Sequence, residues 1–349
     1  MKEEDYADFS RKLDSAKERR PVYGQIELTY RCGYRCVHCY CKNGPKTELG
    51  FDFWKGVFNQ LQEEGCLELT LTGGDPVLHK DFARIYGYAW KKGFLISLFT
   101  NAHNLTDEVI SLLEERRPLN IEITLNSLDS KNYERITGVR DSFDKTIANI
   151  QKLKKRSLPL VLKCNGLKEN RREILKIKRF TEELLGKGKF KYDGLIFPGL
   201  NGEKEPALHR LEPEDVKDIE KEDKDMLEQR MKEAGHQSRW FNPDGLYHCN
   251  SWWTHFYINP EGLLQFCHLS KQFSTDLTKE SFRKGFDRFP RLLEEKPKTS
   301  SRCHSCELKE HCFHCPARAY LETGDMEAPV SYYCRLAKIE AADKKEGDA

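Results

Sequence analysis

The segment Thr-Tyr-Arg-Cys-Gly-Tyr-Arg-Cys-Val-His-Cys-Tyr, residues 29–40, holds Cys32, Cys36 and Cys39 in the spacing C-x3-C-x2-C. A short loop with this spacing can place three thiolates on three corners of a cubane iron–sulfur cluster. The fourth iron then has no protein ligand and is open to a small molecule. Three cysteines are also typical of a zinc site, with His38 or Cys41 as the fourth ligand. The spacing favours a reactive cluster and leaves zinc as the alternative.

Short apolar segments alternate along the chain with amphipathic ones. The candidate strands are 24–30, 67–72, 94–100, 121–126, 158–164 and 191–197. The candidate helices between them are 51–64, 80–92, 107–116, 143–155 and 171–185. Strict alternation of strands and helices predicts an α/β fold whose sheet is parallel and wound with right-handed crossovers.

Polar or glycine-rich motifs follow three of these strands. Leu-Thr-Gly-Gly-Asp-Pro ends at Pro76, Phe-Thr-Asn-Ala contains Asn101, and Thr-Leu-Asn-Ser-Leu-Asp contains Asn126 and Ser127. Two glycines let the backbone bend sharply and approach a ligand closely, and Asp75 can accept hydrogen bonds from a ligand amine. Ordinary turns contain the same residue types.

The cysteine loop and these motifs resemble the radical S-adenosylmethionine (radical SAM) superfamily, whose signature is C-x3-C-x-φ-C with φ aromatic. His38 stands at φ. The resemblance implies a partial (β/α)6 barrel, open on one side, with its chemistry at the C-terminal ends of the strands. It implies that Cys32, Cys36 and Cys39 hold a catalytic [4Fe–4S] cluster whose open iron chelates SAM. One electron then cleaves SAM to methionine and a 5′-deoxyadenosyl radical, which abstracts a substrate hydrogen atom.

The same resemblance assigns the SAM-binding residues by position. Gly-Gly-Asp-Pro matches the Gly-Gly-Glu-Pro motif that binds the SAM amino group, with Asp75 in place of glutamate. The residues implied in cofactor binding are His38, Gly73, Gly74, Asp75, Pro76, Asn101, Asn126 and Ser127.

A second group of cysteines follows residue 247. Its members are Cys249, Cys267, Cys303, Cys306, Cys312, Cys315 and Cys334. Twelve residues separate Cys249 from Gly262, and four separate Gly262 from Cys267. The group resembles the SPASM extension of radical SAM enzymes that modify peptides and proteins. Two residues lie between Cys312 and Cys315, where the SPASM pattern has three.

By that resemblance the group holds two auxiliary [4Fe–4S] clusters. One set would be Cys303, Cys306, Cys312 and Cys334, and the other would be Cys249, Cys267 and Cys315. The second set has only three thiolates, so its fourth iron is open or is held by a histidine, water or substrate. A zinc ribbon is the alternative, because C-x2-C pairs are common zinc knuckles and His304, His311 and His314 are nearby in the chain.

Three cysteines remain outside these sets. Cys41, Cys66 and Cys164 are expected to be buried, inert thiols. Cys164 ends a candidate strand, so the alternative for it is a thiol that faces the cavity and donates a hydrogen atom to a product radical.

Composition limits the protein class. The chain has 349 residues, a net charge of +2, and 38% hydrophobic and 33% charged residues. These values indicate a protein without a strong attraction to nucleic acid or membranes. Thirteen cysteines behind a charged N-terminus argue for metal in a reducing compartment, so we expect a cytoplasmic protein. The expected domains are an N-terminal extension 1–20, the barrel 21–200, a solvated helical linker 201–246, the SPASM domain 247–337 and a frayed tail 338–349.

We expect a radical SAM/SPASM enzyme of the oxidoreductase type that matures a ribosomally synthesised peptide by a crosslink, a thioether or an oxidation. Only about 20 residues precede the first strand, too few for a core. We therefore expect that a separate protein binds the leader peptide, or that the substrate is not a leader-bearing peptide. The expected reductant is a flavodoxin or ferredoxin. The alternatives are a small-molecule enzyme that modifies tetrapyrrole side chains or oxidises alcohols, and a non-catalytic iron–sulfur or zinc protein.

Overall fold

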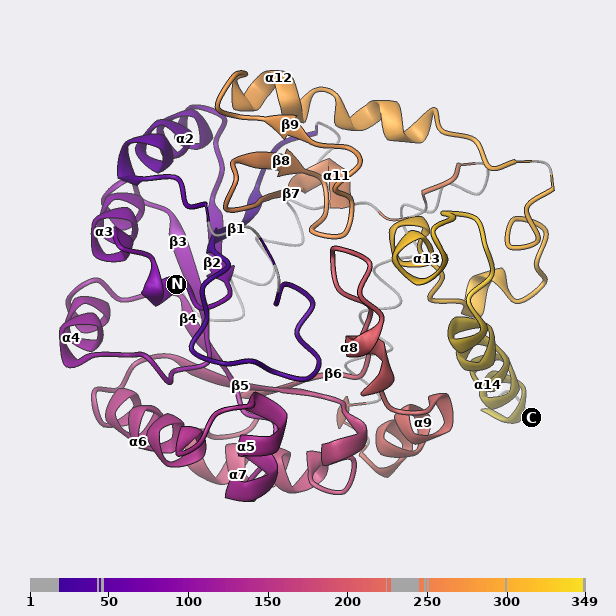
Figure 1. Cartoon of the computed structure of the whole chain (residues 1–349), viewed down its shortest axis with the longest axis horizontal. Helices are drawn as coiled ribbons and strands as arrows, with labels where there is room; N and C mark the ends of the chain where they lie inside the picture. The colour runs from indigo at the N-terminus through magenta and orange to yellow at the C-terminus, as the bar shows by residue number, and fades with distance from the viewer. Residues whose placement is uncertain are drawn as a thin grey trace.

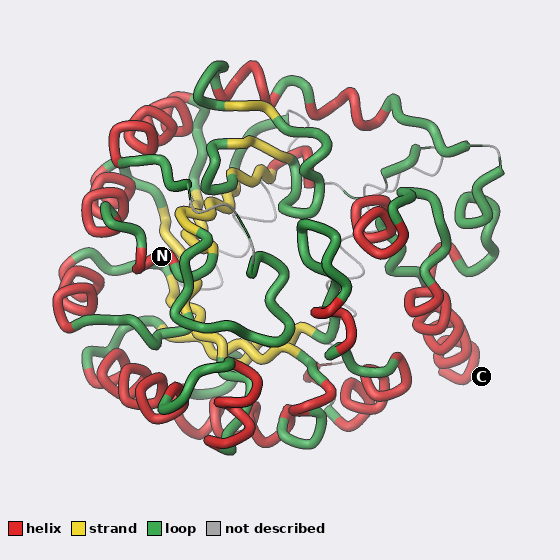
Figure 2. Tube along the Cα trace, in the orientation of Figure 1, coloured by secondary structure: helices red, strands yellow, loops and turns green. Residues whose placement is uncertain are grey.

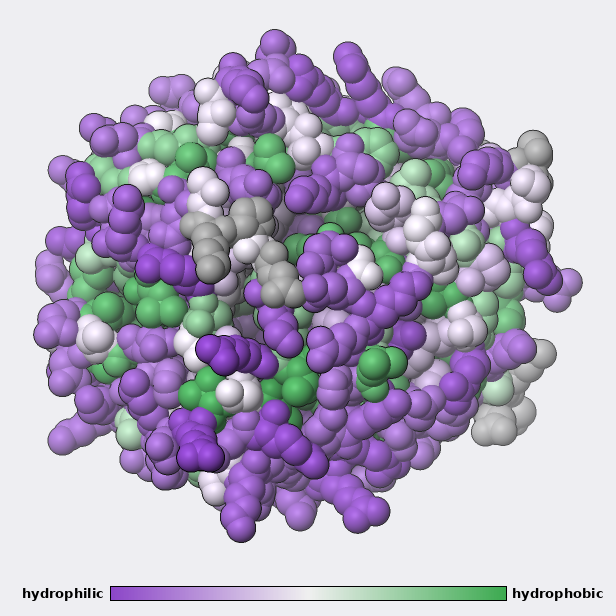
Figure 3. Space-filling view, viewed as in Figure 1, coloured by the Kyte–Doolittle hydropathy of each residue, from purple (hydrophilic) through white to green (hydrophobic). Residues whose placement is uncertain are grey.

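The computed structural model describes residues 19–42, 44, 47–223, 225–226, 245–247, 249, 251–298 and 300–347. These residues form a curved sheet with helices along its convex side (Figure 1). In space-filling view, hydrophilic side chains cover most of one face (Figure 3). In the described part of the chain, no helix is both long and apolar enough to cross a membrane.

The nine-stranded sheet has the order β6-β5-β4-β3-β2-β1-β7-β8-β9. Its strands are β1 (Tyr23–Thr29), β2 (Glu68–Gly73), β3 (Leu95–Thr100), β4 (Asn120–Thr124), β5 (Leu160–Asn165), β6 (Phe190–Asp193), β7 (His255–Ile258), β8 (Leu263–Gln265) and β9 (Thr275–Asp276). Neighbours from β6 to β7 run parallel, and β8 and β9 are antiparallel. The first six strands confirm the predicted parallel α/β sheet, and the sheet is not closed.

The helices lie outside the arc of strands (Figure 2). Those of the first half are α2 (Phe51–Glu63), α3 (Phe82–Lys91), α4 (Asp107–Glu115), α5 (Ser130–Thr137), α6 (Ser142–Lys155) and α7 (Ile174–Leu185). Local signals set several of their ends. Thr106 and Asp129 cap α4 and α5 by accepting from backbone N–H groups, and Gly138 ends α5 in a left-handed conformation.

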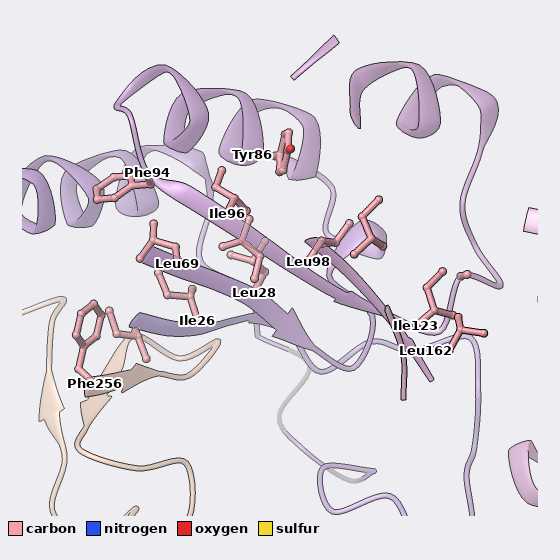
Figure 4. Packing of buried hydrophobic residues seen from close by; sticks show 14 of the residues in the cluster. Ile26, Leu28, Leu69, Tyr86, Phe94, Ile96, Leu98, Ile123, Leu162 and Phe256 are labelled. Carbon is pink, nitrogen blue, oxygen red and sulfur yellow. The ribbon is translucent and has the colours of Figure 1, made fainter. Parts of the chain in front are cut away.

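Successive side chains along each strand point alternately to the helix-covered face and to the concave face of the sheet. Ile26, Leu28, Ile96 and Leu98 are essentially buried and pack toward the helices (Figure 4). Residues between them, such as Glu27, therefore face the concave side of the sheet. The concave side is polar, and it is the side on which the strand-end motifs gather.

The C-terminal third extends the same sheet, which the sequence pattern did not predict. β7 pairs in parallel with β1, so that Gly24 lies opposite Phe256. A Cβ atom on Gly24 would come within 2.3 Å of the Phe256 ring and 2.9 Å of Leu69. The absent side chain is what lets the two segments pack together.

The remaining helices lie between and after these strands. They are α8 (Glu205–Leu208), α9 (Pro213–Glu222), α11 (Ser251–Thr254), α12 (Phe282–Phe286), α13 (Pro316–Thr323) and α14 (Ser331–Gly347). Short 3-10 turns occur at Pro76–Leu78, Lys168–Asn170, Phe289–Leu293 and Lys309–His311.

Two expectations for the charged segments were wrong. Helix α9 is not simply solvated, because Val216 and Ile219 are buried and Lys217 pairs with Glu340 of α14. The expected frayed tail is helical as far as Gly347, since α14 continues through it. Most of the predicted linker beyond residue 226 lies outside the described residues.

Replacing Gly24 by alanine tests the contact between β1 and β7. We expect Gly24→Ala to lower the free energy of unfolding by about 1–3 kcal/mol, because the new methyl group has no space beside Phe256. Gly56→Ala is the matched control, since nothing lies within 4 Å of a Cβ atom there and the site is in helix α2. It should stabilise by about 0.5–1 kcal/mol. Equal effects in denaturant unfolding would contradict the packing argument.

Candidate active site and cysteine clusters

The cysteine loop leaves the end of β1 and is held by backbone hydrogen bonds to the end of α5. Arg35 N donates to the Thr137 carbonyl at 2.8 Å, and Val37 N donates to the Ile136 carbonyl at 3.0 Å. Inside the loop, Tyr34 N donates to Cys32 Sγ at 3.4 Å. These contacts fix the path of the loop at the C-terminal end of the sheet.

The loop turns back on itself between its last two cysteines, where Cys39 N donates to the Cys36 carbonyl at 3.2 Å. Burial raises the pKa of the Cys36 thiol, and Cys39 and Cys32 add to the effect. Cys41 Sγ lies 3.7 Å from Cys39 Sγ. Among the described residues, no three cysteine, histidine or acidic side chains converge closely enough to enclose a single metal ion. The loop brings together the three cysteines that the spacing singled out, with Cys41 beside one of them.

Gly73 and Gly74 bring the end of β2 against this loop. Gly74 N donates to the Thr29 carbonyl and Asp75 N to the Arg31 carbonyl, both at 2.8 Å. A Cβ atom on Gly73 would lie 2.3 Å from Thr29 O, and one on Gly74 would lie 2.4 Å from Arg31 O. The glycines are thus required by contact with the cysteine loop itself.

Asp75 lies beside Cys32 with one carboxylate oxygen unused. Its side chain is fully buried, and Oδ1 accepts a hydrogen bond from Thr100 Oγ1 at 2.8 Å. Oδ2 is buried and has no hydrogen-bond partner among the described residues, although Val77 N–H and the Asn104 amide lie close enough to lower the pKa of this carboxyl group. Burial raises the pKa of Asp75 to about 7. An ammonium or amine ligand would satisfy Oδ2, so this carboxylate fits the SAM amino group.

Asn101 connects β3 to the cysteine loop. Its Nδ2 donates to Cys32 Sγ at 3.3 Å, and its Oδ1 accepts from His103 N at 2.9 Å. Pro76 starts a short 3-10 turn directly after Asp75 and is buried. These residues and the cysteines therefore occupy one end of the sheet, as the resemblance implied.

His38 is held by two amides at the ends of β4 and β5. The Nδ2 atoms of Asn165 and Asn126 lie 3.1 and 3.4 Å from His38 Nε2. Amide nitrogens only donate, so Nε2 is the acceptor and Nδ1 carries the proton. Burial lowers the pKa of His38 to about 4, and Nδ1 is buried with no hydrogen-bond partner among the residues that the structure describes. His38 is therefore a neutral ring with one unused donor.

The Ser127 hydroxyl does not contact the cysteine loop. Ser127 Oγ donates to Glu173 Oε2 at 2.8 Å, and the same oxygen accepts from Leu128 N at 2.8 Å. The hydroxyl ties the turn after β4 to the start of α7. Asn126, its neighbour, is the residue of this motif that contacts the cysteine loop.

Printed contacts link the residues of the proposed four-cysteine set. Cys306 N donates to the Cys303 carbonyl at 3.4 Å, and Cys312 Sγ lies 3.9 Å from the carbonyl of Tyr333, the residue before Cys334. Burial raises the pKa of Cys312 to about 11, and Cys334, Cys303 and Cys306 contribute to the shift. The four residues therefore lie in one part of the C-terminal segment.

The other three cysteines form the second group. Burial raises the pKa of Cys267 to about 12, and the thiols of Cys315 and Cys249 add to the effect. His268 Nδ1 lies 3.8 Å from Cys267 Sγ. The His268 ring packs 5.7 Å from that of Tyr40, the residue after Cys39. An aromatic contact thus joins the second group to the first cysteine loop.

Glu27 is a buried carboxyl group that the sequence analysis did not single out. Its side chain is fully buried, and Oε1 accepts from the Tyr40 hydroxyl at 3.0 Å. Oε2 has no hydrogen-bond partner among the described residues, although the Tyr257 hydroxyl lies close enough to lower the pKa of Glu27. Burial raises its pKa to about 7. The sequence did contain a signal for Glu27: it is a charged residue between Ile26 and Leu28 in an otherwise apolar strand. Because side chains alternate along a strand, it lies on the concave face.

The cysteines outside the sets are buried. Cys164 is fully buried in the main hydrophobic core on the same side of β5 as Leu162, and Asn170 Nδ2 donates to it at 3.6 Å. Cys66 is in the same core. The alternative in which Cys164 faces the cavity is wrong, because its parity along β5 directs it toward the helices.

Comparison with known proteins agrees with this geometry. Residues 26–181 match the family model described as the Radical SAM superfamily. The AdoMet-dependent heme synthase of Methanosarcina barkeri is 25% identical over 332 residues, covering 88% of this chain and 95% of that protein. The subtilosin biosynthesis protein AlbA of Bacillus subtilis is 24% identical over 267 residues, covering 73% of this chain but only 56% of AlbA.

Among solved structures, Streptococcus suis SuiB has the same fold. SuiB bound to S-adenosylmethionine superposes with a TM-score of 0.66 at 16% identity, over 95% of this chain and 81% of that one. SuiB bound to its precursor peptide SuiA gives 0.67 at 17% identity, over 93% and 78%. The family match covers the cysteine loop and Asp75. Residues 26–181 therefore form a radical SAM domain, and the protein is a radical SAM enzyme with S-adenosylmethionine and a [4Fe–4S] cluster as its cofactors.

Proposed function

We propose that this enzyme cleaves S-adenosylmethionine reductively and uses the resulting radical to abstract a hydrogen atom from a ribosomally synthesised peptide. One observation carries the proposal. The three thiols of the first loop, the buried Asp75 with an unused oxygen, and Asn101 meet at one end of the parallel sheet. Strand ends are where enzymes of barrel architecture place their chemistry.

Each residue of this group has a distinct role in the proposal. Cys32, Cys36 and Cys39 hold the cluster, which when bound supplies the electron that cleaves SAM. Asp75 accepts a hydrogen bond from the SAM amino group through Oδ2, and Thr100 orients the carboxylate through Oδ1.

The other assigned residues shape the loop. Asn101 donates to the Cys32 sulfur, and a hydrogen bond of this kind tunes the potential of a cluster. Asn126 fixes the neutral His38 ring at the φ position. Pro76 and the two glycines hold Asp75 against the loop. Ser127 acts through the turn that carries Asn126, by its bond to Glu173.

The C-terminal cysteines hold two auxiliary clusters in the proposed SPASM arrangement. Their separation into a set of four and a set of three supports this arrangement over a single zinc ribbon. The set of three leaves one iron without a cysteine, which suits either a substrate ligand or acceptance of an electron from the substrate radical.

Two relatives favour a peptide substrate. AlbA is named for subtilosin biosynthesis, and SuiB binds the precursor peptide SuiA. The product would carry a crosslink, a thioether or an oxidised residue. A flavodoxin or ferredoxin would supply electrons, and a separate protein would recognise the leader of the peptide.

A tetrapyrrole substrate is the second candidate. The heme synthase relative matches this chain over 95% of its own length, whereas only 56% of AlbA is matched. Incubating the reduced enzyme and SAM with a precursor peptide encoded nearby, or with a propionate-bearing tetrapyrrole, separates the two by mass spectrometry. A mass change in the peptide supports the first, and one in the tetrapyrrole supports the second.

Cys36→Ala tests the assignment of the catalytic cluster. We expect the variant to form no 5′-deoxyadenosine after anaerobic reconstitution with reductant and SAM, because one iron loses its thiolate. The matched control is Cys66→Ala, which removes a buried core thiol and should retain SAM cleavage. If Cys36→Ala still forms 5′-deoxyadenosine at the wild-type rate, the core assignment is wrong.

Cys306→Ala tests the auxiliary cluster of four cysteines. We expect the variant to lose about four irons per chain and to keep some SAM cleavage, while losing product once a substrate is supplied. Cys267→Ala should lose a different cluster, so the double variant should lose about eight irons. Wild-type iron content in Cys306→Ala would exclude that residue as a ligand.

A further inference from the structure

Arg318 lies next to the group of three cysteines. It is in the first turn of α13, which begins directly after Cys315. The apolar residues Ala317 and Leu321 of this helix pack against Leu269, and the same cluster includes Cys267 and Cys315. The helix therefore carries the guanidinium into the region of the two cysteines.

The guanidinium of Arg318 lacks a carboxylate partner. Within the described part of the chain, its hydrogen bond is donated by Nη1 to the Phe313 carbonyl at 3.5 Å. No carboxylate of the described residues lies within ion-pair distance of it, although Asp193 is near enough to act on its charge. Arginine has five N–H donors, and an unpaired charge away from water is costly. An anion bound beside Arg318 would therefore stabilise its charge.

The guanidinium lies beside the turn that leads into Cys315. Its hydrogen bond to the Phe313 carbonyl places Nη1 next to the segment that ends at Cys315, the residue directly before α13. Cys267 packs against the same apolar cluster as Cys315. The electrostatics agree with this placement: burial lowers the pKa of Arg318, but Cys315, Tyr333, Asp193 and Cys267 raise it overall.

We propose that Arg318 is the counter-charge of the cluster held by Cys249, Cys267 and Cys315, and that it raises the reduction potential of that cluster. This inference rests on the proposed function, because it requires the auxiliary cluster. A cluster bound by three thiolates is anionic, and reduction adds one more negative charge. A fixed cation nearby stabilises the reduced form more than the oxidised form.

The consequence concerns the direction of electron flow. In the proposed reaction one electron leaves the substrate radical, which is oxidised, and enters the auxiliary cluster, which is reduced. No bond forms at Arg318, and no proton moves to or from it. By favouring the reduced form, Arg318 makes this set of cysteines the better electron acceptor, so it is a positioning residue.

Arg335 provides a matched control. It directly follows Cys334 of the other set, and it donates to Glu212 at 3.0 Å and to Glu214 at 2.6 Å. Two carboxylates already compensate its charge. Removing Arg335 changes the net charge of the chain as much as removing Arg318 does, but it does not remove a positive charge from beside the three-cysteine set.

The test is a redox titration, followed by electron paramagnetic resonance, of the full chain after anaerobic reconstitution. The signal lost in Cys267→Ala identifies the relevant cluster. We expect Arg318→Gln to lower the ratio of reduced to oxidised cluster at a fixed potential by about tenfold or more, which is about 59 mV for one electron. Arg318→Lys should retain most of the wild-type potential, and Arg335→Gln should not shift it.

An unchanged or raised potential in Arg318→Gln at wild-type iron content would overturn the inference. If Arg318→Gln loses the cluster, retention of cluster and potential in Arg318→Lys still supports a charge role. Loss of the cluster in both variants would show a role in packing alone and overturn it. If the wild type has no cluster signal that Cys267→Ala removes, the auxiliary cluster of the proposed function fails as well.

Discussion

The close approach of two backbone segments underlies the rest of the site. Gly73 and Gly74 have no room for a Cβ atom, because the carbonyls of Thr29 and Arg31 occupy that space. Two backbone hydrogen bonds then join the end of β2 to the start of the cysteine loop. This contact sets where Asp75 lies relative to Cys32. Any side chain at either glycine would move the Asp75 carboxylate, which is proposed to bind the SAM amino group, away from the cysteine loop.

The same sheet also positions the proposed auxiliary ligand Cys267. β7 pairs with β1, and Cys267 and His268 follow β8, which pairs with β7. The His268 ring packs 5.7 Å from that of Tyr40, so residues next to two proposed ligands are in contact. Arg318 adds a fixed charge to that region, and Glu27 adds a buried carboxyl group with an unused oxygen.

Sequence reasoning succeeded where the signal is local. The six strands were found because apolar runs alternate with amphipathic helices. The two cysteine sets were assigned only by resemblance to the SPASM pattern, and they remain a prediction. Sequence reasoning failed where contacts between distant segments determine strand pairing and side-chain partners. β7 is only four residues long, so its pairing with β1 left little pattern. The packing of α9 depends on α14, more than a hundred residues away, and the bond of Ser127 to Glu173 depends on where α7 begins.

Iron and acid-labile sulfide per chain, measured after anaerobic reconstitution, test the central claim most directly. The account predicts about 12 irons and about 12 sulfides, corresponding to one catalytic and two auxiliary cubanes. About four irons together with bound zinc would contradict it. That result would leave the radical SAM core in place but reduce the C-terminal cysteines to a structural module.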